Sequence, residues 1–210
     1  MLAGRSTQWH DDGSGLPSSP ATGDAEPLTA ACLDDGMPLF ELDGVAPRVH
    51  PTAWIAPTAS IIGDVTIEEN ASVWFNVVIR ADMGPIVVRA GANVQDGSVL
   101  HGGPDTTDIG EGVTIGHGCI VHNATIGTEA LIGNGAIVLD RATVGHHTLV
   151  AAGSVVTPGT VIGDEVLAVG SPARERGPLN EVQRMWVDGN PEGYRELARR
   201  YSKGLREAVS

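Results

Sequence analysis

Three of the seven histidines lie close together in the middle of the chain, at His101, His117 and His122. Imidazole is a common metal ligand and a common general base near neutral pH. Three neutral imidazoles leave a bound metal with its full charge and an open coordination position, and the pKa of a metal-bound water then falls to about 7. The three residues therefore predict a catalytic metal centre if they converge, and histidines packed at a subunit contact if they do not.

The segments that carry these histidines follow a repeat of six residues. Residues six apart in a helix differ by about 600° around its axis and share no face, and a simple alternating strand has a period of two. Three short strands per coil, with a turn at each corner, explain the repeat. It predicts an all-β solenoid, a parallel β-helix of hexapeptide repeats with about 18 residues per coil. Its inward aliphatic residues include Val49, Ile55, Ile61, Ile67, Val73 and Ile79, and later Ile126, Ile132, Val138, Val144, Val150, Val156 and Ile162.

The phase of the repeat predicts where two of the histidines lie. His101 follows the inward residue Leu100, and His122 follows the inward residue Val121. The step from Leu100 to Ile109 is nine residues, which we interpret as one hexad with a three-residue loop. Leu100 and Val121 are then one coil apart, so His101 and His122 are expected to stack on neighbouring coils of the same face.

The third histidine has a different phase. His117 lies two residues after the inward residue Ile115, on the preceding side of the coil, and cannot easily join the other two within one chain. In a threefold trimer, one chain can offer His101 and His122 while its neighbour offers His117. The spacing thus predicts three-histidine sites shared between subunits.

Composition excludes other classes of function. The formal net charge of −13 argues against a nucleic-acid binder and against attraction to anionic membranes. Only two cysteines are present, Cys32 and Cys119, which suits a reducing compartment. No apolar run is long enough to cross a membrane as a helix, so we expect a cytoplasmic protein.

Composition also divides the chain into three parts. Residues 1–36 are acidic and rich in Gly, Ser and Pro, and are predicted to form a mostly disordered arm. The β-helix is expected over residues 37–173, and a helical segment that packs on its outside over residues 174–210. Asn190 as N-cap and Pro191 at the first helical position predict that the last helix begins there.

Two sequence runs carry a family resemblance. The run Asn93–His101 (NVQDGSVLH) and the run Ile115–His122 (IGHGCIVH) closely resemble γ-class carbonic anhydrases and their relatives. Residues 72–82, 169–174 and 186–201 are also similar to this family, so that the resemblance covers about residues 37–205. It implies a left-handed β-helix and a homotrimer. It also implies three interface sites in which His101, His117 and His122 bind Zn²⁺, with Fe²⁺ or Co²⁺ as possible replacements.

The same resemblance implies roles for polar residues near the histidines. Arg80 and Asp82 match an interface ion pair, with Asp96 beside it, and a purely structural role remains open for all three. Gln95 matches a residue that hydrogen-bonds near the metal-bound water, and Asn93 matches a residue that lines the pocket. Gln95 and Asn93 are therefore candidate catalytic residues.

The function that follows is reversible hydration of CO2 to bicarbonate by metal-bound hydroxide, a lyase activity. The loop glutamates that shuttle protons in the family are missing, which predicts slow turnover, and Tyr194 is the candidate substitute. Two other functions remain open. One is an acyl-CoA thioesterase or acyltransferase with a histidine as general base, and the other is a non-catalytic trimeric assembly subunit.

Overall fold

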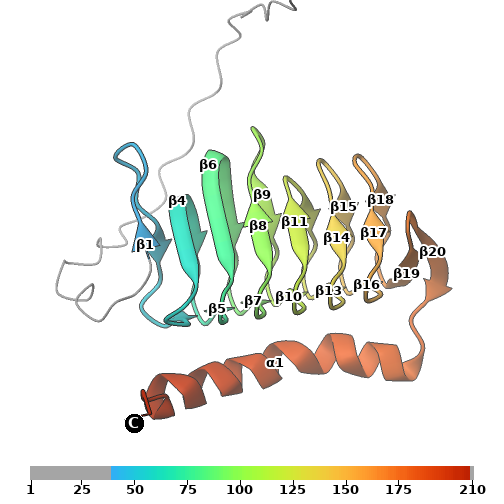
Figure 1. Cartoon of the computed structure of the whole chain (residues 1–210). Coiled ribbons are helices and arrows are strands. Elements are labelled where there is room, and N and C mark those ends of the chain that lie inside the picture. The colour runs from blue at the N-terminus through green and yellow to red at the C-terminus, as the bar shows by residue number, and fades with distance from the viewer. Residues whose placement is uncertain (1–38, 209–210) are drawn as a thin grey trace, which may run out of the picture.

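The computed structural model describes residues 39–208, which form a parallel β-solenoid with one long helix along its side (Figure 1). The predicted arm at residues 1–36 lies outside the described residues. The strands are β1 (Leu39–Phe40), β2 (Arg48–Val49), β3 (Trp54–Ile55), β4 (Ser60–Ile67), β5 (Ser72–Val73), β6 (Val78–Val88), β7 (Asn93–Val94), β8 (Val99–His101), β9 (Thr107–Ile109), β10 (Thr114–Ile115), β11 (Ile120–His122), β12 (Thr125–Ile126), β13 (Leu131–Ile132), β14 (Ile137–Val138), β15 (Thr143–Val144), β16 (Leu149–Val150), β17 (Val155–Val156), β18 (Val161–Ile162), β19 (Val166–Gly170) and β20 (Ala173–Pro178), and the helix is α1 (Glu181–Gly204).

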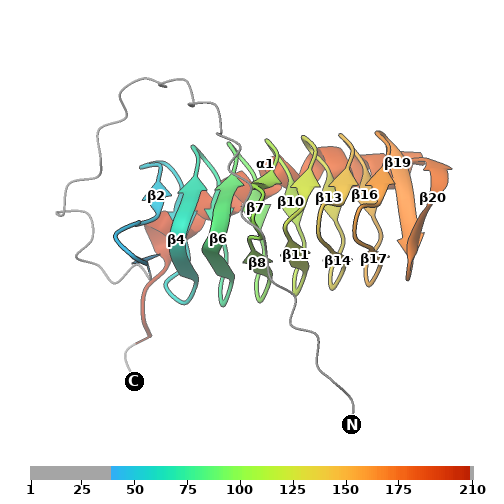
Figure 2. The same cartoon turned by 90° about the horizontal axis from the view of Figure 1, so that it is seen from above.

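The strands form two sheets, and the coils of the solenoid stack along one axis (Figure 2). An eight-stranded sheet has the order β20-β19-β16-β13-β10-β7-β5-β3, and a twelve-stranded sheet contains the remaining strands. All strand pairs are parallel except β19 with β20. Val138 pairs with Val156, so the coil there has the predicted length of three hexads. The predicted all-β solenoid of hexapeptide repeats is confirmed, whereas its left-handed sense stays a prediction.

The inward aliphatic residues form the core. Ile79, Leu100, Val121 and Val138 lie directly above one another in successive coils and are fully buried. Each buried side chain of this size contributes about 1.5–3 kcal/mol relative to an exposed one. The pairing of Leu100 with Val121 confirms the predicted coil and its three-residue loop.

The C-terminal region differs from the prediction at the start of the helix. Residues 173–178 form β20, and α1 begins at Glu181 after the N-cap Asn180. Asn180 and Gln183 form a capping box with two hydrogen bonds of 2.9 Å. The prediction that the helix begins at Asn190 and Pro191 is wrong, because α1 continues through Pro191. Proline costs the helix one backbone hydrogen bond, and the buried contact of Pro191 offsets part of this cost.

Two apolar clusters attach α1 to the eight-stranded sheet (Figure 1). The C-terminal half of the helix packs on an aromatic cluster, in which the ring of Trp74 lies 4.7 Å from Trp54 and 5.2 Å from Tyr201 between centroids. The N-terminal half packs through Val187 on Leu131. Among the residues described, no helix is apolar enough over a sufficient length to span a membrane.

Candidate functional site

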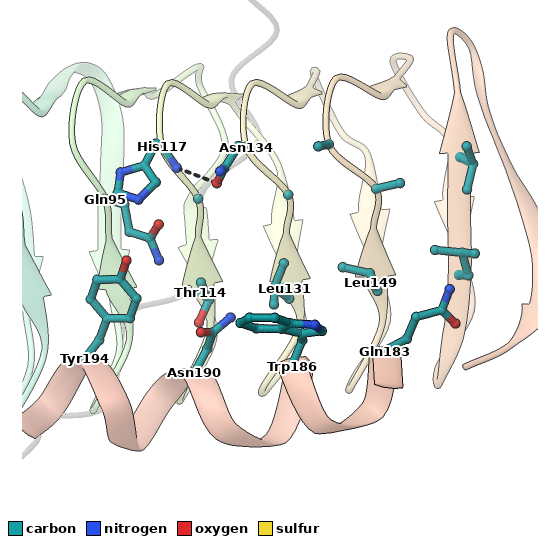
Figure 3. Close-up of a pocket in the computed structure, with 16 residues that line it drawn as sticks. Gln95, Thr114, His117, Leu131, Asn134, Leu149, Gln183, Trp186, Asn190 and Tyr194 are labelled. Atoms are coloured by element: carbon teal, nitrogen blue, oxygen red, sulfur yellow. Dashed lines mark hydrogen bonds between the residues drawn. The ribbon is translucent and has the colours of Figure 1, made fainter. Parts of the chain in front are cut away.

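A groove with a volume of ≈ 510 Å³ lies between α1 and the eight-stranded sheet (Figure 3). This volume lies within the range of small-molecule sites, which combine apolar walls with a few polar groups. The groove is lined by Gln95, Thr114, Gly116, His117, Leu131, Gly133, Asn134, Leu149, Ala151, Ala152, Leu167, Val169, Gln183, Trp186, Asn190 and Tyr194.

Buried amides lie at one end of the groove. Gln95 Nε2 donates a hydrogen bond of 3.0 Å to Asn93 Oδ1, and Asn93 Nδ2 donates one of 2.9 Å to Thr114 Oγ1. This chain of bonds holds the Gln95 amide beside the Tyr194 hydroxyl (Figure 3). Burial, and then the negative charge of Asp96, raise the pKa of Tyr194, so its hydroxyl stays protonated as a hydrogen-bond donor.

His117 lies at the same end, in the turn after β10 (Figure 3). Its Nδ1 is 3.0 Å from Asp96 Oδ2, and its backbone N–H donates a 3.1 Å hydrogen bond to Asn134 Oδ1. Among residues 39–208, no side chain or backbone group is hydrogen-bonded to His117 Nε2. An imidazole beside a carboxylate, with its other nitrogen free, is the arrangement of a general base.

Farther along the solenoid axis, the sheet side of the groove is apolar. Leu131, Leu149 and Leu167 stack on neighbouring strands and point outward toward α1. Trp186 of α1 lies against this row, closest to Leu131 in Figure 3. The sheet side of the groove therefore changes from polar to apolar along the solenoid axis.

His101 and His122 lie on the twelve-stranded sheet, away from the groove. They pair in register on β8 and β11, with ring centroids 5.0 Å apart, which confirms the predicted stack. His101 Nε2 is 2.8 Å from Asp82 Oδ1, and Asp82 also pairs with Arg80. The hydrogen bond from His101, and the nearby charge of Arg80, hold the pKa of the Asp82 carboxyl below its usual value.

The phases of the three histidines predict that they do not meet within one chain, and in the structure they lie apart. His101, His117 and His122 each have a carboxylate within 3.0 Å, and for His122 this is Asp140, which the sequence analysis missed. The part of the chain that the structure describes holds no group of three or more His, Cys, Asp or Glu side chains that could bind a metal.

The leucine row and Trp186 were also missed, although the sequence carries a signal for the leucines. Each leucine precedes an inward residue, so its side chain must point outward, and Leu131, Leu149 and Leu167 follow one another at intervals of one coil. Three apolar residues in one outward row indicate that another element covers this face of the sheet.

No family model matches the chain, but several known proteins do. The carnitine operon protein CaiE of Escherichia coli O157:H7 is 37% identical over 172 residues, which are 81% of this chain and 88% of CaiE. A hexapeptide transferase family protein from Anaplasma phagocytophilum is 41% identical with a TM-score of 0.75, over 79% of this chain and 98% of that one. The chain belongs to the hexapeptide-repeat family. A further member of known structure, a presumed acetyltransferase from Bacillus cereus, is 34% identical with a TM-score of 0.78, over 80% of this chain and 98% of that one.

These comparisons correct the prediction of a carbonic anhydrase. The similar proteins are CaiE and transferases, so the γ-class resemblance is not supported, and CO2 hydration, the lyase assignment and the zinc cofactor with its Fe²⁺ or Co²⁺ replacements are wrong. The N-acyltransferase AntD from Bacillus cereus, solved with coenzyme A, is 15% identical with a TM-score of 0.59, which shows a shared fold alone.

Proposed function

We propose that the protein transfers an acyl group from an acyl-CoA thioester to a hydroxyl or amine acceptor, with His117 as general base. The observation that carries the proposal is the position of His117, beside Asp96 and at the polar end of the groove. The transferase names of two similar proteins support the same class of reaction. Acyl-CoA as donor also fits the cytoplasmic location that the composition predicts.

The residues at the polar end suit each step of this reaction. His117 Nε2 takes the proton of the acceptor while the acceptor oxygen or nitrogen attacks the thioester carbonyl. The intermediate then collapses, the C–S bond breaks, and the proton passes from the imidazolium to the departing thiolate to give free CoA thiol. Asp96 stabilises the imidazolium through its charge. Tyr194 and the Gln95 amide provide hydrogen-bond donors for the carbonyl oxygen.

We also propose that the protein is a homotrimer that associates through the face carrying His101 and His122. An outward apolar row runs beside these histidines, and within it Val99 and Ile120 are 37% and 42% exposed. A trimer would cover this row and place His101 and His122 next to a neighbouring chain. The row consists of Val78, Val99, Ile120, Ile137 and Val155.

Light scattering tests the assembly. The unaltered chain is expected to have the mass of three chains, and Ile120→Lys the mass of one. Val161→Lys is the matched control, because Val161 is 72% exposed on a different row of strands. A single-chain mass for the unaltered protein would refute the trimer.

Turnover of thioesters tests the activity. The full-length protein is incubated with acetyl-, butyryl- and octanoyl-CoA, each with and without a mixture of small alcohols and amines. Release of CoA thiol is followed by a thiol reagent and the acylated product by mass spectrometry. We expect CoA release that depends on the acceptor. Release without acceptor would show hydrolysis in place of transfer, and no release with any donor would contradict the proposal.

A further inference from the structure

The groove extends from the candidate base His117 along the apolar side chains Leu131, Leu149 and Leu167. Resting on the proposed function, we infer that its apolar end binds the tail of a medium-length acyl chain whose carbonyl lies beside His117. The acyl donor would then be a medium-chain acyl-CoA. The inference depends on the order of residues along one outward row of the eight-stranded sheet.

The side chains of this outward row change from polar to apolar directly after the coil of His117. Asn93 and Thr114 are the outward residues of β7 and β10, and they belong to the buried hydrogen-bonded chain under Gln95. Directly after Thr114 the row becomes Leu131 and then Leu149. A ligand bound along the row thus meets polar groups next to the base and aliphatic groups on every following coil.

The length of the apolar part limits the ligand. From Leu131 through Leu149 to Leu167 the apolar row makes two steps between strands. At about 4.8 Å per step these span about 10 Å. An extended alkyl chain advances about 1.25 Å per carbon, from C–C bonds of about 1.5 Å, so about eight carbons fill this length.

Part of the apolar surface is left uncovered by the chain itself. Val187 of α1 packs on Leu131, but Leu149 remains only partly buried and Trp186 is 59% exposed although it lines the groove. A flexible alkyl chain between the Trp186 ring and Leu149 would remove both side chains from water. Trp186 is therefore the residue that we expect to cover the acyl tail.

A polar side chain closes the far end of the groove. Gln183 lies at the end of the row, near β19 (Figure 3). Its Oε1 accepts a 2.9 Å hydrogen bond from the Asn180 N–H, which holds the side chain in the capping box. A longer chain would have to desolvate this amide, so binding should stop improving once the tail reaches Gln183.

Binding of S-alkyl-CoA thioethers tests the inference without turnover, because these molecules lack the reacting carbonyl. Calorimetry measures the Kd of the S-ethyl, S-butyl, S-hexyl, S-octyl and S-dodecyl compounds with the full-length protein. A fully buried methylene strengthens binding about fourfold, which corresponds to about 0.8 kcal/mol. Since the groove is open, we expect S-octyl-CoA to bind at least tenfold more tightly than S-ethyl-CoA. No further gain is expected for S-dodecyl-CoA.

Two neighbouring helix residues give a matched pair of variants. Trp186→Ala should remove most of the difference between S-octyl- and S-ethyl-CoA, while leaving the Kd of S-ethyl-CoA within about threefold. Met185→Ala should leave both values unchanged, because Met185 is 66% exposed and does not line the groove. Both side chains are exposed, so neither change should unfold the protein.

The outcomes separate the inference from the proposed function. Equal affinities for all chain lengths, together with acetyl-CoA turnover, would refute the acyl groove and leave acyl transfer standing. No binding of any thioether and no turnover would refute both. A change in assembly mass on Trp186→Ala, with the chain-length dependence intact, would show that the groove is a contact between copies and would overturn the inference.

Discussion

Replacement of His117 by Gln separates a chemical role of this residue from a structural one. The side chain of His117 is 48% exposed and that of its partner Asp96 is 42% exposed. A charge pair with this exposure contributes at most about 1 kcal/mol to the free energy of unfolding. The backbone hydrogen bond from His117 to Asn134 does not involve the imidazole and survives the change. We therefore expect the Tm of His117→Gln to fall by no more than about 4 °C.

The effect on rate should be much larger than the effect on stability. A positioned general base contributes about 10²–10⁴-fold, which corresponds to about 2.7–5.5 kcal/mol in the activation barrier. We expect His117→Gln to lose acyl transfer by this factor. Asp96→Asn keeps the imidazole but removes the charge that stabilises its protonated form, so it should lose less. The same change should lower the pKa of Tyr194, because the charge of Asp96 helps to raise it.

Initial rates of CoA thiol release at saturating donor and acceptor measure the loss, and thermal unfolding of the same samples measures stability. His50→Gln is the control, since His50 is exposed and lies outside the groove. If His117→Gln keeps more than a tenth of the activity, His117 is not the general base. If activity and Tm both collapse, the loss is structural and His117 contributes more to stability than its exposure indicates.

Three further predictions concern the fold. Ile162→Ala removes an inward side chain and should destabilise the protein by about 2–5 kcal/mol, whereas Val161→Ala on the same strand should change the stability by no more than about 0.5 kcal/mol. Urea unfolding measures both, and similar losses would contradict the assignment of Ile162 to the inside and Val161 to the outside of the coil. Asn180→Ala breaks the capping box of α1 and should cost about 1 kcal/mol in the same assay, and no loss would contradict the cap. Burial raises the pKa of the Cys119 thiol to about 11, so iodoacetamide at pH 8 should label Cys119 in urea and not in the folded protein. Peptide mass spectrometry measures the labelling, and rapid labelling of the folded protein would contradict the burial of Cys119.

The repeat of six predicted most of the fold because its cause is local. Each side of a coil needs one aliphatic side chain in the narrow interior, so the inward positions can be counted along the chain. The inward positions stay in register across the loop between Leu100 and Ile109, as the observed pairing of Leu100 with Val121 confirms. The count also placed His101 and His122 on neighbouring coils, where the structure has them.

The start of the helix was mispredicted because two capping signals compete in this region. Asn190 with Pro191 suggests a start, but so does Asn180 followed three residues later by Gln183. The local sequence does not show which of the two capping signals starts the helix. The structure uses Asn180, which lets α1 run along the sheet from Val187 to the aromatic cluster under Tyr201. The buried contacts of this longer helix outweigh the hydrogen bond that Pro191 cannot make.

The groove could not be predicted from the sequence because it exists only where α1 passes over the sheet. The pattern of histidines also leaves their chemistry open, since imidazole serves equally well as a metal ligand and as a base. Which role it takes depends on what lies near each ring nitrogen. For His117 that information is the position of Asp96, which is distant in sequence but lies only one coil away in space.

The solenoid separates the residues that stabilise it from those that line its groove. Inward positions must stay aliphatic or small, because each stacks on an identical position in the next coil. Outward positions on the eight-stranded sheet have no such constraint, and here they change from Thr114 to Leu131 within a single step. Proteins with the same inward repeat can therefore bind different molecules through one outward row and the helix that covers it. For this reason the proposed acyl site is best tested by replacing Leu149 and Trp186, because these changes alter the groove and leave the inward core intact.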